Sequence, residues 1–170
     1  MQLTKGQVSL KPPAISDAKD ISLLANNRKV SINMRDRFPY PYTEQNALDF
    51  IANQQNKTPA ETFGIFYNDK AIGLIGLFPQ EDVYRFSAEL GYWIGEPYWG
   101  KGITPDAINL IVPYAFDVLK LTRIYADIFD SNPASMRVLE KCGFTFEGVF
   151  KKSVFKDGKF LDSRRYAIVR

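Results

Sequence analysis

Two glycines flank a lysine near the middle of the chain, in the order Trp99-Gly100-Lys101-Gly102. Glycine has no Cβ, so the backbone N–H groups of such a loop can approach a ligand closely. A helix predicted to begin at about Thr104 adds unpaired N–H donors and a partial positive charge. A lone Gly-x-Gly pair more often marks a plain turn, so only the whole arrangement of loop and helix indicates a phosphate-binding site.

One acidic residue lies in the predicted strand that precedes this loop. Strict alternation over residues 86–94 places Glu89 on the same face as Ser87, Gly91 and Trp93. This face is the more open and polar one, and a carboxylate there can accept the proton that an attacking ammonium group must lose. The alternative is a structural carboxylate that pairs with an arginine.

Alternation, caps and turn signals predict a mixed α/β chain. Strands are expected at residues 8–11, 62–67, 71–78, 86–94 and 123–129, and in a final hairpin around Asp157-Gly158. Helices are expected after the caps Ser16, Thr43 and Asn132, and over residues 104–120. The resulting order is β-α-α-β-β-β-α-β-α-β-β, and residues 1–170 are expected to form a single domain.

Composition excludes several classes of chemistry. The chain has no histidine and one cysteine, Cys142, so histidine triads, His or Cys metal sites and an intrachain disulfide are excluded. The net charge of +3 includes no dense Lys/Arg run, so no nucleic-acid partner is expected. No stretch approaches the roughly 20 apolar residues of a membrane span, and no secretory segment opens the sequence, so a cytoplasmic protein is expected.

Four segments together resemble the GNAT superfamily of N-acetyltransferases. They are Ala88-Glu89-Leu90-Gly91-Tyr92-Trp93-Ile94, Trp99-Gly100-Lys101-Gly102-Ile103-Thr104, Asp130-Ser131-Asn132-Pro133-Ala134-Ser135 and Glu140-Lys141-Cys142-Gly143-Phe144. The resemblance covers nearly the whole chain from about Val8 and looks closest to the branch of ribosomal-protein N-terminal (alanine) acetyltransferases. It implies a mostly antiparallel sheet that splays between the fourth and fifth strands of the predicted order.

The same resemblance implies acetyl-CoA as co-substrate and no metal. The diphosphate would lie on the glycine loop, and the pantetheine arm would pair with the strand that carries Glu89. The cofactor-binding residues implied are Trp93, Ile94, Trp99, Gly100, Lys101, Gly102, Ile103, Thr104 and Asn132. Pro97 stands where the family often has Gln or Arg, so one side-chain contact is expected to be missing.

Glu89 and Ser135 are the catalytic candidates. In the resembled family Glu89 would be the general base, and a tyrosine would protonate the leaving thiolate where this chain has Leu139. Ser135 is then the substitute donor to the sulfur, although a plain role in the first helical turn explains it equally well. Asn132 would cap the helix, with or without a contact to the pantetheine arm.

The acceptor is expected to be a primary amine, preferably the N-terminal α-amine of a protein. Its entrance would be shaped by Arg35, Arg37, Phe38, Tyr40 and Tyr42, unless Phe38 and Tyr40 belong to the core. A small amine, such as a polyamine or an amino sugar, is the enzymatic alternative. A non-catalytic acyl-CoA-binding module is the alternative from another class, and a homodimer is left open.

Overall fold

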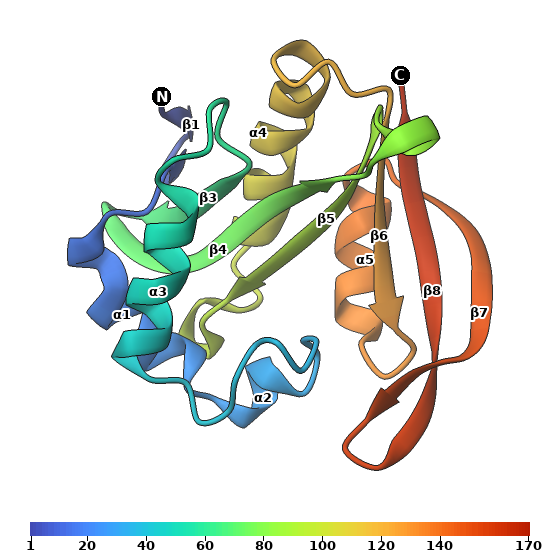
Figure 1. Cartoon of the computed structure of the whole chain (residues 1–170), viewed down its shortest axis with the longest axis horizontal. Helices are drawn as coiled ribbons and strands as arrows, with labels where there is room; N and C mark the ends of the chain where they lie inside the picture. Colours follow the sequence, from blue (N-terminus) through green and yellow to red (C-terminus); the bar gives the residue numbers. More distant parts are fainter. The chain divides into compact units, whose positions relative to one another are not determined.

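The computed structural model describes residues 1–170 and contains one eight-stranded sheet in the order β1-β2-β3-β4-β5-β6-β8-β7 (Figure 1). The strands are β1 Leu3–Lys5, β2 Val8–Lys11, β3 Thr62–Tyr67, β4 Lys70–Pro79, β5 Ser87–Ile94, β6 Arg123–Phe129, β7 Thr145–Lys156 and β8 Lys159–Val169. The helices are α1 Ala18–Ala25, α2 Arg28–Ser31, α3 Glu44–Gln54, α4 Ile103–Asp117 and α5 Pro133–Lys141. Short 3-10 turns are η1 Ile15–Asp17, η2 Asp82–Tyr84 and η3 Glu96–Tyr98.

The predicted fold class is confirmed, with two additional elements. β1 pairs antiparallel with β2 through a turn at Gly6, whose φ of +58° suits a glycine. The three residues of β1 are too few for an alternation pattern to indicate a strand. The short helix α2 is begun by Asn27, whose side chain accepts a hydrogen bond from the Lys29 N–H.

The chain divides into two compact units that alternate along the sequence. The first comprises Met1–Gly76 and Tyr92–Ile111, and the second comprises Leu77–Gly91 and Val112–Arg170. β4, β5 and α4 each contribute residues to both units. The single domain expected from the sequence stays a prediction.

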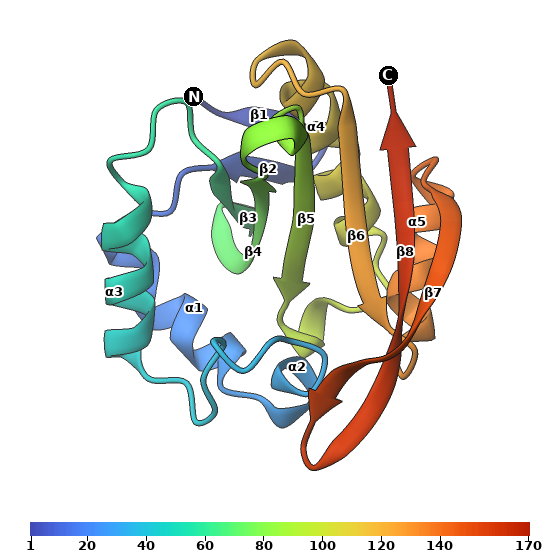
Figure 2. The same cartoon turned by 45° about the vertical axis from the view of Figure 1, so that its right-hand side comes forward.

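The first unit has a core beneath α1 and α3, which lie side by side (Figure 2). Ile21 and Ala25 of α1 pack with Ala47 and Ile51 of α3, at the helical spacing expected for a buried face. Thr43 caps α3 as predicted and forms a capping box with Asn46. The cluster consists of Ala18, Ile21, Ala25, Val30, Tyr42, Ala47, Ile51, Phe66, Ala71, Leu74 and Trp93.

In the second unit, β6 pairs with β8 on one side and with the first residues of β5 on the other. β6 pairs antiparallel with β8 over the full length of β6, from Arg123↔Val169 to Phe129↔Ser163, and α5 lies behind them (Figure 2). β5 and β6 pair in parallel only from Ser87↔Arg123 to Glu89↔Tyr125. The register ends there although β5 continues to Ile94, which fits the splay predicted between these two strands.

One predicted helix cap is wrong. Ser16 lies inside η1, and it is Asp17 whose carboxylate accepts the backbone N–H of Ala14 at 2.8 Å. This hydrogen bond reaches back to a residue before η1, and Asp17, which precedes α1, makes no side-chain cap hydrogen bond to that helix. The cap at Asn132 and the turn at Asp157-Gly158, with φ of +50° and +75°, agree with prediction.

Candidate functional site

The glycine loop presents an open row of backbone donors. Gly100 and Gly102 have φ values of +72° and +76°, and a Cβ added to either would meet no atom within 4 Å. The Asp106 N–H donates to the Gly102 carbonyl at 3.3 Å, so α4 begins immediately after Gly102. The first N–H groups of a helix have no partner within it, which leaves those of Ile103 and Thr104 to a ligand or to water. Pro105, the third residue of α4, has no N–H to contribute.

The side chains of this loop have distinct surroundings. The Trp99 indole donates to the Ile94 carbonyl at 2.9 Å, so its ring bridges the loop and the end of β5. Lys101 is exposed, with its ammonium 5.5 Å from the centre of the Tyr98 ring. Ile103 is buried, which confines any part it plays in binding to its backbone.

The start of the loop is anchored to the segment between α1 and α2. The Glu96 carboxylate accepts from the Asn27 amide at 2.7 Å and from the Lys29 ammonium at 2.5 Å. These hydrogen bonds, first that of Lys29 and then that of Asn27, hold the pKa of Glu96 below its ordinary value. Gly95 fits beneath Leu24, whose Cδ2 would lie 2.7 Å from an added Cβ. These contacts hold Gly95 and Glu96, the residues that lead into the glycine loop, in place.

Trp93 is buried, so the face that it was predicted to share with Glu89 is not open at this end of β5. Its side chain belongs to the core cluster, with its ring 5.6 Å from that of Phe38. Burial alternates from Ser87 to Gly91, but Trp93 and Ile94 are both buried, because both faces of the strand are covered at its end. Any part that Trp93 plays toward a cofactor is therefore that of its backbone.

The backbone N–H of Ile94 points away from β4. The Gly95 N–H donates to the Ile72 carbonyl of β4 at 2.8 Å. Because successive residues of a strand present their N–H groups to opposite edges, Trp93 shares the orientation of Gly95 and Ile94 has the opposite one. Of the backbone N–H groups of Trp93 and Ile94, that of Ile94 is therefore the one not directed at β4.

Glu89 is half-buried, at the last residue pair that joins β5 to β6. Its register partner is Tyr125, and neighbours in a ladder project to the same face. Asp127, two residues along β6, shares that face and binds Arg165 of β8 through two hydrogen bonds, Nε to Oδ1 at 2.8 Å and Nη2 to Oδ2 at 2.7 Å. Sequence analysis did not identify these three residues, although the alternation of Tyr125 and Asp127 was readable.

Asn132 and Ser135 open α5. The Asn132 side chain accepts the Ser135 N–H at 3.4 Å, which confirms the cap. Ser135 and Leu139 are one helical turn apart on the buried face, and Leu139 is fully buried. A tyrosine in place of Leu139 would overfill this site, so the chain is built around the smaller side chain.

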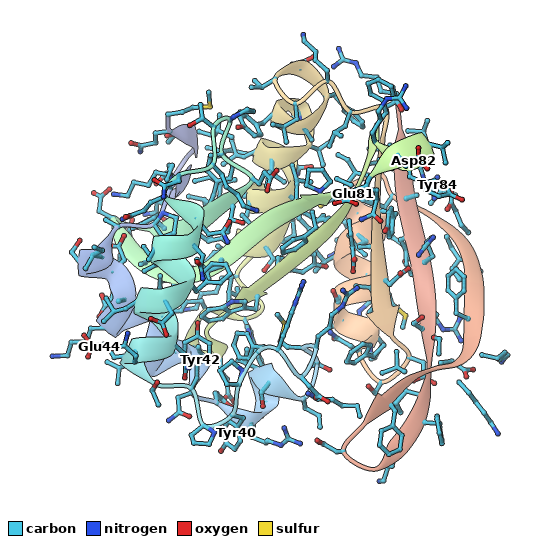
Figure 3. The ribbon with its side chains drawn as sticks, in the orientation of Figure 1. Tyr40, Tyr42, Glu44, Glu81, Asp82 and Tyr84 are labelled. Atoms are coloured by element: carbon cyan, nitrogen blue, oxygen red, sulfur yellow. The ribbon has the colours of Figure 1, made fainter.

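The aromatic turn is divided between core and surface. Phe38 packs against the core, 4.9 Å from the buried Tyr42, so the core alternative holds for Phe38 but not for Tyr40. Tyr40 is 52% exposed at the outer edge of the turn, with the guanidinium of Arg28 5.6 Å from its ring (Figure 3). Arg35 and Arg37 are exposed as well. Tyr40 is therefore the aromatic residue of the turn that a ligand can reach.

The candidate residues fall into two groups. The loop, the end of β5 and α4 bring together Trp93, Ile94, Trp99, Gly100, Lys101, Gly102, Ile103 and Thr104 in the first unit. Glu89, Asn132 and Ser135 belong to the second unit, and Glu89 is linked to the first group along β5 itself. No group of three His, Cys, Asp or Glu residues is arranged to hold a metal ion, and no helix is long and apolar enough to span a membrane.

Comparison with known proteins identifies the family. The protein-family model for the acetyltransferase (GNAT) domain matches residues 7–145 of this chain. The chain is 34% identical to the probable N-acetyltransferase YjcK of Bacillus subtilis, over 98% of this chain and 97% of the relative. It is 30% identical to the spermidine N(1)-acetyltransferase of Vibrio cholerae, over 96% and 94%. The chain therefore belongs to the GNAT family of acetyltransferases.

Two further likenesses bear on the cofactor and the acceptor. A solved structure of the Microcin C7 self-immunity acetyltransferase MccE, in complex with acetyl-CoA and AMP, superimposes with a TM-score of 0.84 at 27% identity, covering 98% of this chain and 94% of that one. The ribosomal-protein-serine acetyltransferase of Escherichia coli is 32% identical over 64% of this chain and 60% of its own length. The relatives thus act on different acceptors.

Proposed function

We propose that the protein transfers an acetyl group from acetyl-CoA to the N-terminal α-amine of a protein, with Glu89 as general base. The observation that carries the proposal is the sequence of parts along β5: a carboxylate at Glu89, a backbone N–H of Ile94 that points away from β4, and an open glycine loop before α4. Ribosomal proteins, which are made in the cytoplasm, would be reached by an enzyme in that compartment.

The glycine loop fits the diphosphate of the co-substrate. Both glycines adopt a backbone conformation that leaves their N–H groups uncrowded, and the start of α4 adds further donors and a partial positive charge. Lys101 contributes a solvated positive charge beside the loop. The thioester of acetyl-CoA supplies the activated acetyl group, and the residues of this chain bind and orient it.

Proton transfer is assigned to Glu89. The ammonium group of the acceptor gives one proton to this carboxylate, directly or through water, and the neutral nitrogen then attacks the thioester carbonyl. A carbon–nitrogen bond forms and the carbon–sulfur bond breaks, while the nitrogen gives up a second proton and the departing thiolate takes one up, so that the amide and neutral CoA result. The Ile94 N–H, which points away from β4, can stabilise the oxygen on which negative charge develops.

Ser135 is proposed to hydrogen-bond the leaving sulfur. We expect Ser135→Ala to lower kcat by about tenfold without weakening CoA binding, because the hydroxyl would act only on the developing thiolate. The measurement is steady-state turnover together with the thermal midpoint with and without CoA. Ser16→Ala, the same change at an exposed serine of η1 outside the candidate site, is the control. Full turnover in Ser135→Ala would leave the serine as a plain first-turn residue.

The acceptor class is tested by competition. An α-amine has a pKa of about 7.7–8.0, against about 10.4 for a lysine side chain, so a useful share is already neutral at pH 7. We expect short peptides with a free N-terminus to be acetylated faster than the same peptides with a blocked N-terminus and an internal lysine. The readout is CoA release, with the product confirmed by mass. A preference for spermidine or an amino sugar would instead support the small-amine alternative.

Two alternatives have specific support. The similarity to the Vibrio cholerae spermidine N(1)-acetyltransferase favours a polyamine. The replacement of the family's tyrosine by Leu139 favours a module that binds acyl-CoA without turnover. The same screen separates them, because the module would bind CoA and acetylate none of the amines. A homodimer is a further proposal, which sedimentation of the purified protein tests.

A further inference from the structure

The open face of the second unit holds an arginine in an unusually constrained position. The guanidinium of Arg165 lies 4.2 Å from the centre of the Tyr125 ring and 4.8 Å from that of the Phe150 ring. Its Nε and Nη2 groups are engaged by the two oxygens of Asp127. Two stacked rings and a two-point carboxylate contact fix the orientation of this planar group.

One edge of the Arg165 guanidinium takes no part in the contact with Asp127. An arginine has five N–H donors, and the contact with Asp127 uses only Nε and Nη2. The Nη1 group, with two N–H donors, takes no part in it. The Arg165 side chain is 30% exposed, so an incoming molecule can reach this edge.

Arg165 is also close enough to the proposed base to interact with it. Tyr125, beneath the guanidinium, is the register partner of Glu89 on the neighbouring strand. The pKa of Arg165 is raised first by its hydrogen bonds to Asp127, then by the charges of Asp127, Tyr125 and Glu89. Glu89 and the free edge of Arg165 therefore belong to one polar surface.

We propose that Arg165 determines acceptor specificity by donating hydrogen bonds from Nη1 to a backbone carbonyl at the start of a peptide whose amine lies at Glu89. This inference rests on the proposed function and names the acceptor chemistry at the same site. In an extended peptide a carbonyl oxygen follows the terminal amine within one residue, about 3.3 Å of chain, and the next one a residue later. A guanidinium above Tyr125 can reach one of them.

The same chemistry disfavours polyamines. A protonated polyamine has only N–H donors and positive charge, and it offers a guanidinium no acceptor atom. The carboxylates of Asp127 and Glu147 are already bound by Arg165 and Arg123, so neither is left to attract a second ammonium group. The surface around Glu89 is thus suited to an amine that carries a carbonyl nearby.

The test compares two acceptors in two proteins. The acceptors are a short peptide beginning with alanine and the same peptide with its first two carbonyls reduced to methylenes. We expect Arg165→Lys to lower the ratio of their kcat/KM values by about tenfold, because a charge-assisted hydrogen bond is lost for the first acceptor only. Differences in amine pKa cancel when the two ratios are compared.

Arg164→Lys is the matched control, since Arg164 is the neighbouring residue on β8 and alternation directs it to the opposite face. The ratio of the two kcat/KM values measured with Arg164→Lys should equal the ratio measured with the native protein. If Arg165→Lys fails to fold, the native protein alone can test the proposal. At high pH, where the amines of both acceptors are neutral, its kcat/KM for the unreduced peptide should exceed that for the reduced one by about tenfold or more. Equal kcat/KM values there, or an unchanged ratio in Arg165→Lys, would overturn the assignment while leaving the acetyltransferase itself intact. Acetylation of no amine at all would instead refute the proposed function.

Discussion

Replacing Glu89 by glutamine is expected to lower turnover at pH 7 by about 10²-fold or more, the usual contribution of a general base. Glutamine keeps the shape of the side chain but cannot accept a proton. The half-buried position next to Tyr125 is preserved, so folding should be unaffected. The measurement is kcat at saturating acetyl-CoA, with CoA binding followed separately by the thermal midpoint, which should not change.

The pH dependence makes this expectation sharper. As the pH rises through about 8, an increasing share of a peptide α-amine is neutral in solution and needs no base. The gap between Glu89→Gln and the native protein should therefore narrow with rising pH. Glu81→Gln is the control, because this exposed residue before β5 loses the same charge at the turn between β4 and β5 (Figure 3). Native turnover in Glu89→Gln at pH 7 would show that water takes the proton.

Local signals predicted the backbone of this fold well. Thr43 and Asn132 mark helix starts because their side chains accept N–H groups three residues later, a contact that the sequence nearly determines alone. The glycines at 100 and 102 likewise lie where a positive φ was needed. Such features depend on neighbouring residues, so a single sequence contains enough information to find them.

Long-range contacts were the ones that sequence reasoning missed. Strict alternation indicated which face Trp93 shares, but it did not indicate that Phe38 and the core cluster cover that face at the end of the strand. The pairing of Asp127 with Arg165 joins residues 38 positions apart, and that of Asn27 with Glu96 joins residues 69 apart. These contacts depend on strand order and on how α1 and α2 meet the loop, which no local pattern specifies.

Introducing a glutamate at Gly102 is expected to abolish CoA binding. An added side chain at Gly102 meets no protein atom within 4 Å, so the cost to folding is limited to the strained φ of +76°, on the order of 1 kcal/mol. The negative charge would instead stand at the N-terminus of α4, where the diphosphate is proposed to lie, and repel it. CoA should then no longer raise the thermal midpoint, as it should for the native protein. Gly158→Glu is the matched control, because Gly158 has a φ of +75°, equally open surroundings and a place in the β7–β8 turn outside the loop. Retention of native CoA affinity in Gly102→Glu would move the diphosphate away from this loop.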